Sequence, residues 1–263
     1  MIFIDKFITF LAARRTRRYL TFDRYESDSL AAAEKEKSYL LYMHIPFCQE
    51  LCPYCSFVRV KFDRCLAIKY FAALKKEIAL YHEQGFRFDS IYVGGGTPTV
   101  MPEELAEVIE YARTFWEIKR LSVETNPNHL TDDILGILKA AGVNRLSVGV
   151  QSFNNEILES TDRLAKYGLG EEIAERLSSI AGMFDTLNAD MVFNFANQSD
   201  EMIMQDIEIL KKVCVDQVTW YPLMVSKGQK KELFEKCGEV DYRREKQLYK
   251  LIVENLGQVY KQQ

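Results

Sequence analysis

Residues 42–57 of this chain read YMHIPFCQELCPYCSF and hold three cysteines, Cys48, Cys52 and Cys55, spaced C-x3-C-x2-C. With six cysteines in 263 residues, chance would produce such a triplet roughly 0.003 times in a chain of this length. Three thiolates cannot complete a structural zinc site, which takes four ligands. They can hold three irons of a 4Fe–4S cluster and leave the fourth iron open. The spacing therefore predicts a cluster with one free coordination position.

The residues around the cysteines narrow this interpretation. Pro53 restricts the loop, and Tyr54 places an aromatic ring directly before the last cysteine, where a purine can stack. The stretch resembles the radical S-adenosylmethionine (SAM) superfamily, whose motif has this spacing and an aromatic residue before the third cysteine. The lead-in YMHIPFC, which begins at Tyr42, is similar to that of the oxygen-independent coproporphyrinogen III oxidase family.

That resemblance implies a set of cofactors and an activity. In the family the open iron binds the amino and carboxylate groups of SAM, and one electron cleaves SAM to methionine and a 5′-deoxyadenosyl radical. Cys48, Cys52 and Cys55 would then be the cluster ligands, with Tyr42 and Tyr54 beside SAM. The implied function is that of a radical SAM oxidoreductase that acts on a tetrapyrrole. Its electrons would come from a reductant protein such as flavodoxin or ferredoxin.

A glycine run, Gly94-Gly95-Gly96-Thr97-Pro98, follows a short apolar segment about 40 residues beyond the cysteines. Glycines let the backbone approach a ligand and expose unhindered N–H and C=O groups. The run is similar to the GGGTP motif of the same family. The resemblance implies that Gly95, Gly96 and Thr97 contact SAM.

Four polar residues complete the expected SAM site. Glu124 lies in VETNP, Gln151 in GVQSF, Arg163 in TDR and Asp190 in a strand-like segment, and each matches a family motif. A carboxylate at a strand end can accept hydrogen bonds from ribose hydroxyls or an ammonium group. A guanidinium can donate two bonds to the SAM carboxylate.

Strand-like and helix-like segments alternate from Leu40 onward, which predicts a parallel sheet with right-handed crossovers. We expect six strands, at residues 40–47, 90–93, 120–125, 145–151, 186–193 and 217–225. We expect helices at 62–84, 102–116, 131–141, 154–182 with a break near 168, 200–213 and 242–255. The chemistry-bearing residues follow the strands, where α/β folds place their sites. The fold class is therefore α/β, a partial (β/α)6 barrel like that of the radical SAM family.

We expect two parts, an N-terminal helix and linker over residues 1–39 and the barrel over residues 40–263. The apolar run from Ile2 to Leu11 is too short to span a bilayer, so no stable membrane insertion is expected. That run either packs on the barrel or lies as an amphipathic helix on a membrane surface. The net charge of −4 argues against a general nucleic-acid binder. Scattered further cysteines suggest a reduced, cytoplasmic protein.

Three departures from the family pattern leave the reaction open. Phe57 stands where the oxidases carry a further cysteine, and residues 190–197, DMVFNFAN, lack the usual Gly-Leu-Pro. The family also continues with a C-terminal domain, which we expect to be missing here. Haem chaperones and haem-degrading methyltransferases of the family lack the further cysteine as well. A chaperone that binds haem without turnover and a methyltransferase therefore stay as alternatives to the decarboxylase.

Overall fold

The computed structural model describes residues 11–12, 14–15, 32–34, 36–224, 230–257 and 259–261. Contacts divide the chain into two units, residues 1–33 and 34–263. Most of the expected N-terminal helix and linker lies outside the described residues. Among the described residues, no helix is both long enough and apolar enough to cross a bilayer.

Six parallel strands form one sheet in the order β1-β4-β5-β6-β7-β8. Their bounds are β1 (Tyr39–Ile45), β4 (Phe88–Gly95), β5 (Arg120–Thr125), β6 (Arg145–Gln151), β7 (Thr186–Phe193) and β8 (Gln217–Pro222). Each strand pairs with the next one of this sheet along the chain. This order confirms the expected α/β architecture, a partial (β/α)6 barrel.

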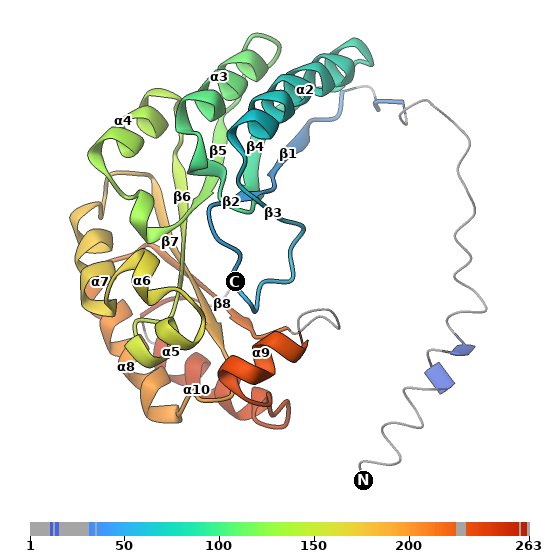
Figure 1. The fold of residues 1–263 in the computed structure, drawn as a ribbon. Coiled ribbons are helices and arrows are strands. Elements are labelled where there is room, and N and C mark those ends of the chain that lie inside the picture. The colour runs from blue at the N-terminus through green and yellow to red at the C-terminus, as the bar shows by residue number, and fades with distance from the viewer. Residues whose placement is uncertain are drawn as a thin grey trace. The chain divides into compact units, whose positions relative to one another are not determined.

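Helices connect the strands and cover the outer side of the sheet (Figure 1). They are α2 (Arg64–Glu83), α3 (Pro102–Arg113), α4 (Asp132–Ala140), α5 (Asn155–Ser160), α6 (Leu164–Tyr167), α7 (Gly170–Ser179), α8 (Asp200–Val213), α9 (Lys230–Cys237) and α10 (Glu245–Leu256). Two single turns, η1 (Pro98–Val100) and η2 (Pro127–His129), follow β4 and β5. Helix α3 shows how they pack, since Leu105, Val108, Ile109 and Ala112 recur at helical spacing and are fully buried.

Aromatic side chains pack around the amino-terminal ends of β1 and β4. The rings of Phe88 and Trp116 meet edge to face at 4.7 Å, and the indole N–H donates to the carbonyl of Phe86 at 2.9 Å. Tyr39 and Tyr81 pack on the same group. This aromatic cluster joins the starts of β1 and β4 to α2, which holds Tyr81, and to the segment after α3, which holds Trp116.

Most expected boundaries match the structure, and the differences have local causes. The helix expected over 154–182 has an additional break at residues 161–163, where Asp162 adopts a left-handed φ of 57°. Thr131 takes the N-cap position of α4 but makes no side-chain capping bond. Helix α9 was not predicted, because its sequence is largely charged. The sixth strand ends at Pro222, before the expected Val225, and the last helix begins at Glu245 instead of Tyr242.

A buried carboxyl group joins the end of β6 to α8. Asp206 is completely buried and accepts hydrogen bonds from the Ser152 hydroxyl and the Phe153 backbone N–H, both at 2.8 Å. Burial raises the pKa of Asp206 to about 7 from 3.8. The folded protein therefore holds a proton there that the unfolded chain has already lost between pH 4 and 7.

We expect Asp206 to make the protein less stable as pH rises. Since the folded state binds the extra proton, its stabilisation is full below pH 4 and is lost as pH rises through 7, on the order of 4 kcal/mol at most. Asp206→Asn keeps a neutral side chain at every pH and should flatten this slope. Urea unfolding between pH 4 and 8 measures it.

The exposed variant Asp133→Asn is the control and should keep the slope of the unchanged protein. An equal slope in Asp206→Asn and in the unchanged chain would contradict the assignment.

Candidate functional site

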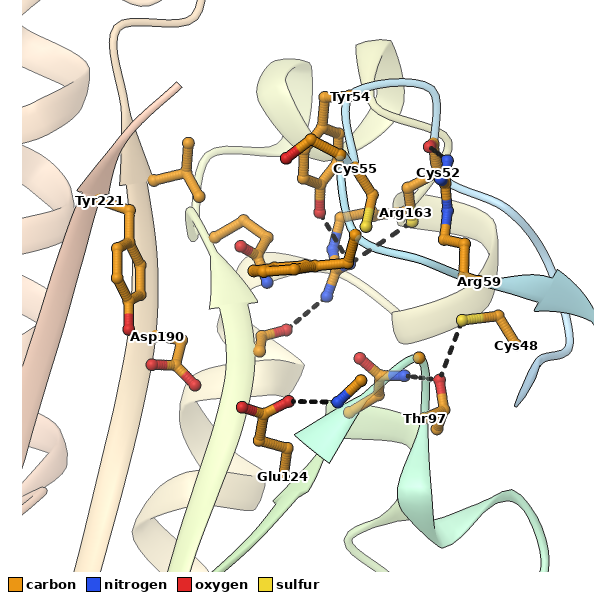
Figure 2. A pocket seen from close by; sticks show the side chains of 18 of the residues that line it. Cys48, Cys52, Tyr54, Cys55, Arg59, Thr97, Glu124, Arg163, Asp190 and Tyr221 are labelled. Atoms are coloured by element: carbon orange, nitrogen blue, oxygen red, sulfur yellow. Dashed lines mark hydrogen bonds between the residues drawn. The ribbon is translucent and has the colours of Figure 1, made fainter. Parts of the chain in front are cut away.

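A cavity of about 500 Å³ opens at the carboxyl ends of the strands, between the sheet and the cysteine loop. Figure 2 shows Cys48, Cys52 and Cys55 on the loop side, with Asp190 and Tyr221 on the strands across from them and Glu124 below. The lining includes eleven of the twelve residues singled out from the sequence: Cys48, Cys52, Tyr54, Cys55, Gly95, Gly96, Thr97, Glu124, Gln151, Arg163 and Asp190. These residues lie between positions 48 and 190 of the chain, and the cavity brings them together at one end of the sheet.

The cysteine loop is closed at its base by a short ladder. Strand β2 (Phe47–Cys48) pairs with β3 (Val60–Lys61), and the Phe62 N–H donates to the Cys48 carbonyl at 2.7 Å. Within the loop, the Arg59 guanidinium donates to the Cys52 carbonyl at 2.5 Å. These bonds fix the two ends of the loop, so all three thiols face one region.

All six cysteines of the chain are free thiols. Burial raises the pKa of the Cys48 and Cys55 thiols. Among the described residues, no three His, Cys, Asp or Glu side chains lie close enough to form a ready metal site. The three thiols thus share a loop and a cavity without being preset in a coordination geometry.

The glycine run brings the end of β4 against the first cysteine. A Cβ on Gly96 would lie 2.9 Å from the Cys48 sulfur and 2.8 Å from the Phe47 carbonyl oxygen. Gly95 has a φ of +123°, a conformation that side chains rarely allow. Only glycine at both positions lets this backbone line the cavity beside the sulfur.

Two carboxylates project into the cavity from neighbouring parts of the sheet. Glu124 accepts hydrogen bonds from the Tyr92 hydroxyl at 2.6 Å and the Gly95 N–H at 3.1 Å. Asp190 accepts from the Ser147 hydroxyl at 2.6 Å and the Asn188 amide at 2.9 Å. Burial raises the pKa of Asp190 to about 6, so it is largely ionised at neutral pH.

Arg163 ties the cysteine loop to the sheet. Its side chain is almost fully buried, and it donates to the Cys52 sulfur at 3.7 Å, to the Tyr54 hydroxyl at 3.0 Å and to the Gly149 carbonyl. The guanidinium also lies 4.0 Å over the ring of Tyr167. Its Nε is buried without a hydrogen-bond partner.

The remaining expected residues differ in their placement. Gln151 lines the cavity from a strained backbone with φ 73°, next to a register shift between β6 and β7. Tyr54 packs edge to face on Phe195 at 5.7 Å, which anchors the tip of the loop. Tyr42 lies outside the cavity lining, where its half-exposed ring stacks on Tyr92 and its hydroxyl bonds the His44 ring at 2.9 Å.

Comparison with known proteins identifies the family. A family model described as the radical SAM superfamily matches residues 42–237, a range that includes every residue lining the cavity. The chain belongs to the radical SAM superfamily.

Several radical SAM relatives are similar in sequence. Heme chaperone HemW of Lactococcus lactis is 32% identical over 188 residues, which cover 70% of this chain and 48% of the relative. HemW of Bacillus subtilis is 32% identical over 191 residues, covering 70% and 50%. An oxygen-independent coproporphyrinogen III oxidase of Bradyrhizobium diazoefficiens is 33% identical over 190 residues, covering 68% and 40%. The chain thus spans about half the length of the curated relatives it matches.

Several solved structures share the fold. Coproporphyrinogen III oxidase (HemN) from Escherichia coli superposes with a TM-score of 0.74 at 24% identity, over 84% of this chain and 53% of that one. SuiB of Streptococcus suis bound to SAM has a TM-score of 0.59 at 14% identity, over 83% and 47%. At these identities the likeness concerns the fold alone.

Several residues of this radical SAM site were missed by the sequence analysis. Asn126 donates to the Thr97 hydroxyl at 2.9 Å, and Tyr92 holds Glu124. Arg59 and Tyr167 line the cavity. Asn126 lies inside the VETNP motif and Tyr92 stands two residues before the glycine run, so their positions in the sequence were a usable signal. Nothing local marked Tyr167, whose role depends on contact with Arg163.

We expect Gly96→Ala to displace Cys48 in this radical SAM chain, because the new methyl group would lie 2.9 Å from its sulfur. Such overpacking costs about 1–3 kcal/mol. The melting temperature should fall, and the buried Cys48 thiol should react faster with an alkylating reagent. Peptide mass spectrometry after timed alkylation measures the rate at Cys48.

Gly136→Ala is the matched control, since a Cβ there meets nothing within 4 Å. In a helix, this change is neutral or stabilises by up to about 1 kcal/mol. Equal melting temperatures and equal Cys48 reactivity in the two variants would contradict the close approach.

Proposed function

We propose that this chain binds a 4Fe–4S cluster through Cys48, Cys52 and Cys55, binds SAM in the adjoining cavity, and cleaves it reductively to act on a tetrapyrrole. One observation carries the proposal. The three thiols on one loop share a single cavity with the backbone of Gly95 and Gly96. Membership of the radical SAM superfamily supports the same cofactors.

The residues of the cavity fit such a cluster in three ways. The loop offers three sulfur donors, which suits a cluster that keeps one iron open. Two buried donor atoms beside the loop, Nε of Arg59 and Nε of Arg163, have no partner, and they suit an anionic group. Gly96 leaves room next to Cys48. Each thiolate of such a cluster binds a different iron, so the three sulfurs need not lie as close together as the ligands of a single metal ion.

When bound, the cluster would supply the electron that breaks a carbon–sulfur bond of SAM. The chain's own part is to hold SAM in place and to keep water away. We propose that Gly95, Gly96 and the Thr97 backbone contact its amino acid part. Glu124 would accept bonds from its ammonium or ribose groups.

Five further residues would complete SAM binding. We propose contacts for Gln151 and Asp190 on the sheet side, and for Tyr54 at the loop tip. The orphan Nε of Arg163 suits the carboxylate of SAM, while its other donors hold the loop. Tyr42 would act from outside the cavity, through the ring of Tyr92.

The proposed substrate is a tetrapyrrole, since relatives are named for heme and for coproporphyrinogen III. The mouth of the cavity supports a large apolar ligand, because Phe57, Tyr221 and Met224 line it with exposed side chains. In the decarboxylase version, a propionate side chain of coproporphyrinogen III loses CO2. The barrel over residues 40–263 would be the unit that does this, in the cytoplasm and with flavodoxin or ferredoxin as reductant.

A haem chaperone is the second candidate. Phe57 stands where the oxidases carry a further cysteine, and its ring is 68% exposed at the cavity. An apolar ring at that place suits contact with a haem face better than metal ligation. The methyltransferase alternative predicts methylated linear tetrapyrrole and S-adenosylhomocysteine as products.

We expect each of Cys48→Ala, Cys52→Ala and Cys55→Ala to lose at least most of the cluster, because two thiolates cannot hold it. Anaerobic reconstitution of the chain, followed by iron and sulfide analysis and the visible absorption spectrum, measures this. Cys65→Ala and Cys214→Ala, both at exposed positions, should load like the unchanged chain. Equal loading in all five variants would contradict the ligand assignment.

We expect the reconstituted chain with dithionite to form 5′-deoxyadenosine, and to form more of it with its substrate. The assay compares coproporphyrinogen III, haem and no tetrapyrrole, with products followed by liquid chromatography and mass spectrometry. Tight haem binding without substrate-dependent 5′-deoxyadenosine would instead support the chaperone.

A further inference from the structure

Each of the three cysteine sulfurs has its own hydrogen-bond donor, and the three donors differ in kind. The Thr97 hydroxyl lies 3.7 Å from the Cys48 sulfur, and a guanidinium nitrogen of Arg163 lies 3.7 Å from the Cys52 sulfur. Cys55 receives the backbone N–H of Phe57. Of these donors, only the Thr97 hydroxyl is neutral, belongs to a side chain and comes from the sheet.

The position of Thr97 is fixed on both sides. Its backbone N–H donates to the Phe47 carbonyl at 2.8 Å, directly before Cys48 in the chain. The amide of Asn126, at the end of β5, donates to its hydroxyl oxygen at 2.9 Å. A threonine hydroxyl carries one hydrogen. Since Asn126 is a donor to the oxygen, that single hydrogen is left for the Cys48 sulfur.

We propose that this Asn126–Thr97 relay is a positioning device that holds Cys48 and raises the reduction potential of the cluster. The inference rests on the proposed function, because it needs the cluster. A hydrogen bond to a ligating thiolate withdraws negative charge and favours the reduced, more negative state. The site is also largely buried, where such bonds act strongly.

The relay gives the Thr97 side chain a role apart from SAM contact. Its hydrogen points at the sulfur and its oxygen accepts from Asn126, so the side chain is already engaged before any ligand enters. The backbone of Thr97 stays available at the cavity. Through Thr97, the residues that follow β4 and β5 would thereby set the position and charge of the Cys48 sulfur, while Arg163 donates to the Cys52 sulfur.

The test compares three variants of the full chain after anaerobic reconstitution. Thr97→Val keeps the shape and removes the hydroxyl, whereas Thr97→Ser keeps the hydroxyl. Thr99→Val is the control, since the Thr99 hydroxyl bonds Thr125 and His129 at 2.7 Å and no sulfur. The midpoint potential of the cluster is measured by redox titration, with the electron paramagnetic resonance signal of the reduced form as readout.

We expect a more negative potential in Thr97→Val, and the potential of the unchanged chain in Thr97→Ser and Thr99→Val. Asn126→Ala should shift it in the same direction by less, because the hydroxyl stays but is no longer oriented. If Thr97→Val loads no cluster while Thr97→Ser does, the holding role of the hydroxyl is supported.

Two results would overturn the inference by itself. One is an unchanged potential in Thr97→Val, and the other is loss of the cluster in both Thr97→Val and Thr97→Ser, which would assign the position to packing. An unchanged chain that never shows a cluster spectrum would instead overturn the proposed function.

Discussion

The buried guanidinium of Arg163 is the interaction on which the arrangement of the cavity depends. A buried cation is costly unless hydrogen bonds compensate for its lost hydration, and the two terminal nitrogens of this guanidinium donate to the loop and to the sheet. It reaches the Cys52 sulfur and the Tyr54 hydroxyl on one side and the Gly149 carbonyl on the other. Residues more than 90 positions apart in the chain are thereby held around one charge.

The sheet supplies the second half of this arrangement. Because all six strands run parallel in chain order, their carboxyl ends meet at one edge and bring the glycine run, Glu124, Gln151 and Asp190 together. The cavity therefore follows from topology, and the individual side chains decide only what it can hold.

Much of the fold could be predicted from the sequence, because short strand-like segments such as residues 120–125 and 186–193 alternate with helix-like segments along the chain. The cysteine loop could also be recognised from the sequence, since its three thiols lie within eight consecutive residues. The hydrogen-bond partners of Arg163 and Thr97 could not be predicted, because these partners lie dozens of residues away in the chain. Helix α9 was missed because a charged segment gives little periodic signal. Tyr42 is the one predicted SAM residue that does not line the cavity, and its contact with SAM stays a prediction.

At Gln151, which has a left-handed backbone, the stability of the fold and the polar lining of the cavity make opposite demands. A non-glycine residue there costs about 1–2 kcal/mol, and glycine would relieve that strain. Glycine would also remove the amide that the register shift after Gly149 turns into the cavity. Replacing Gln151 with glycine would therefore make the fold more stable but remove a polar group from the cavity. Selection for thermal stability alone would favour the loss of that group.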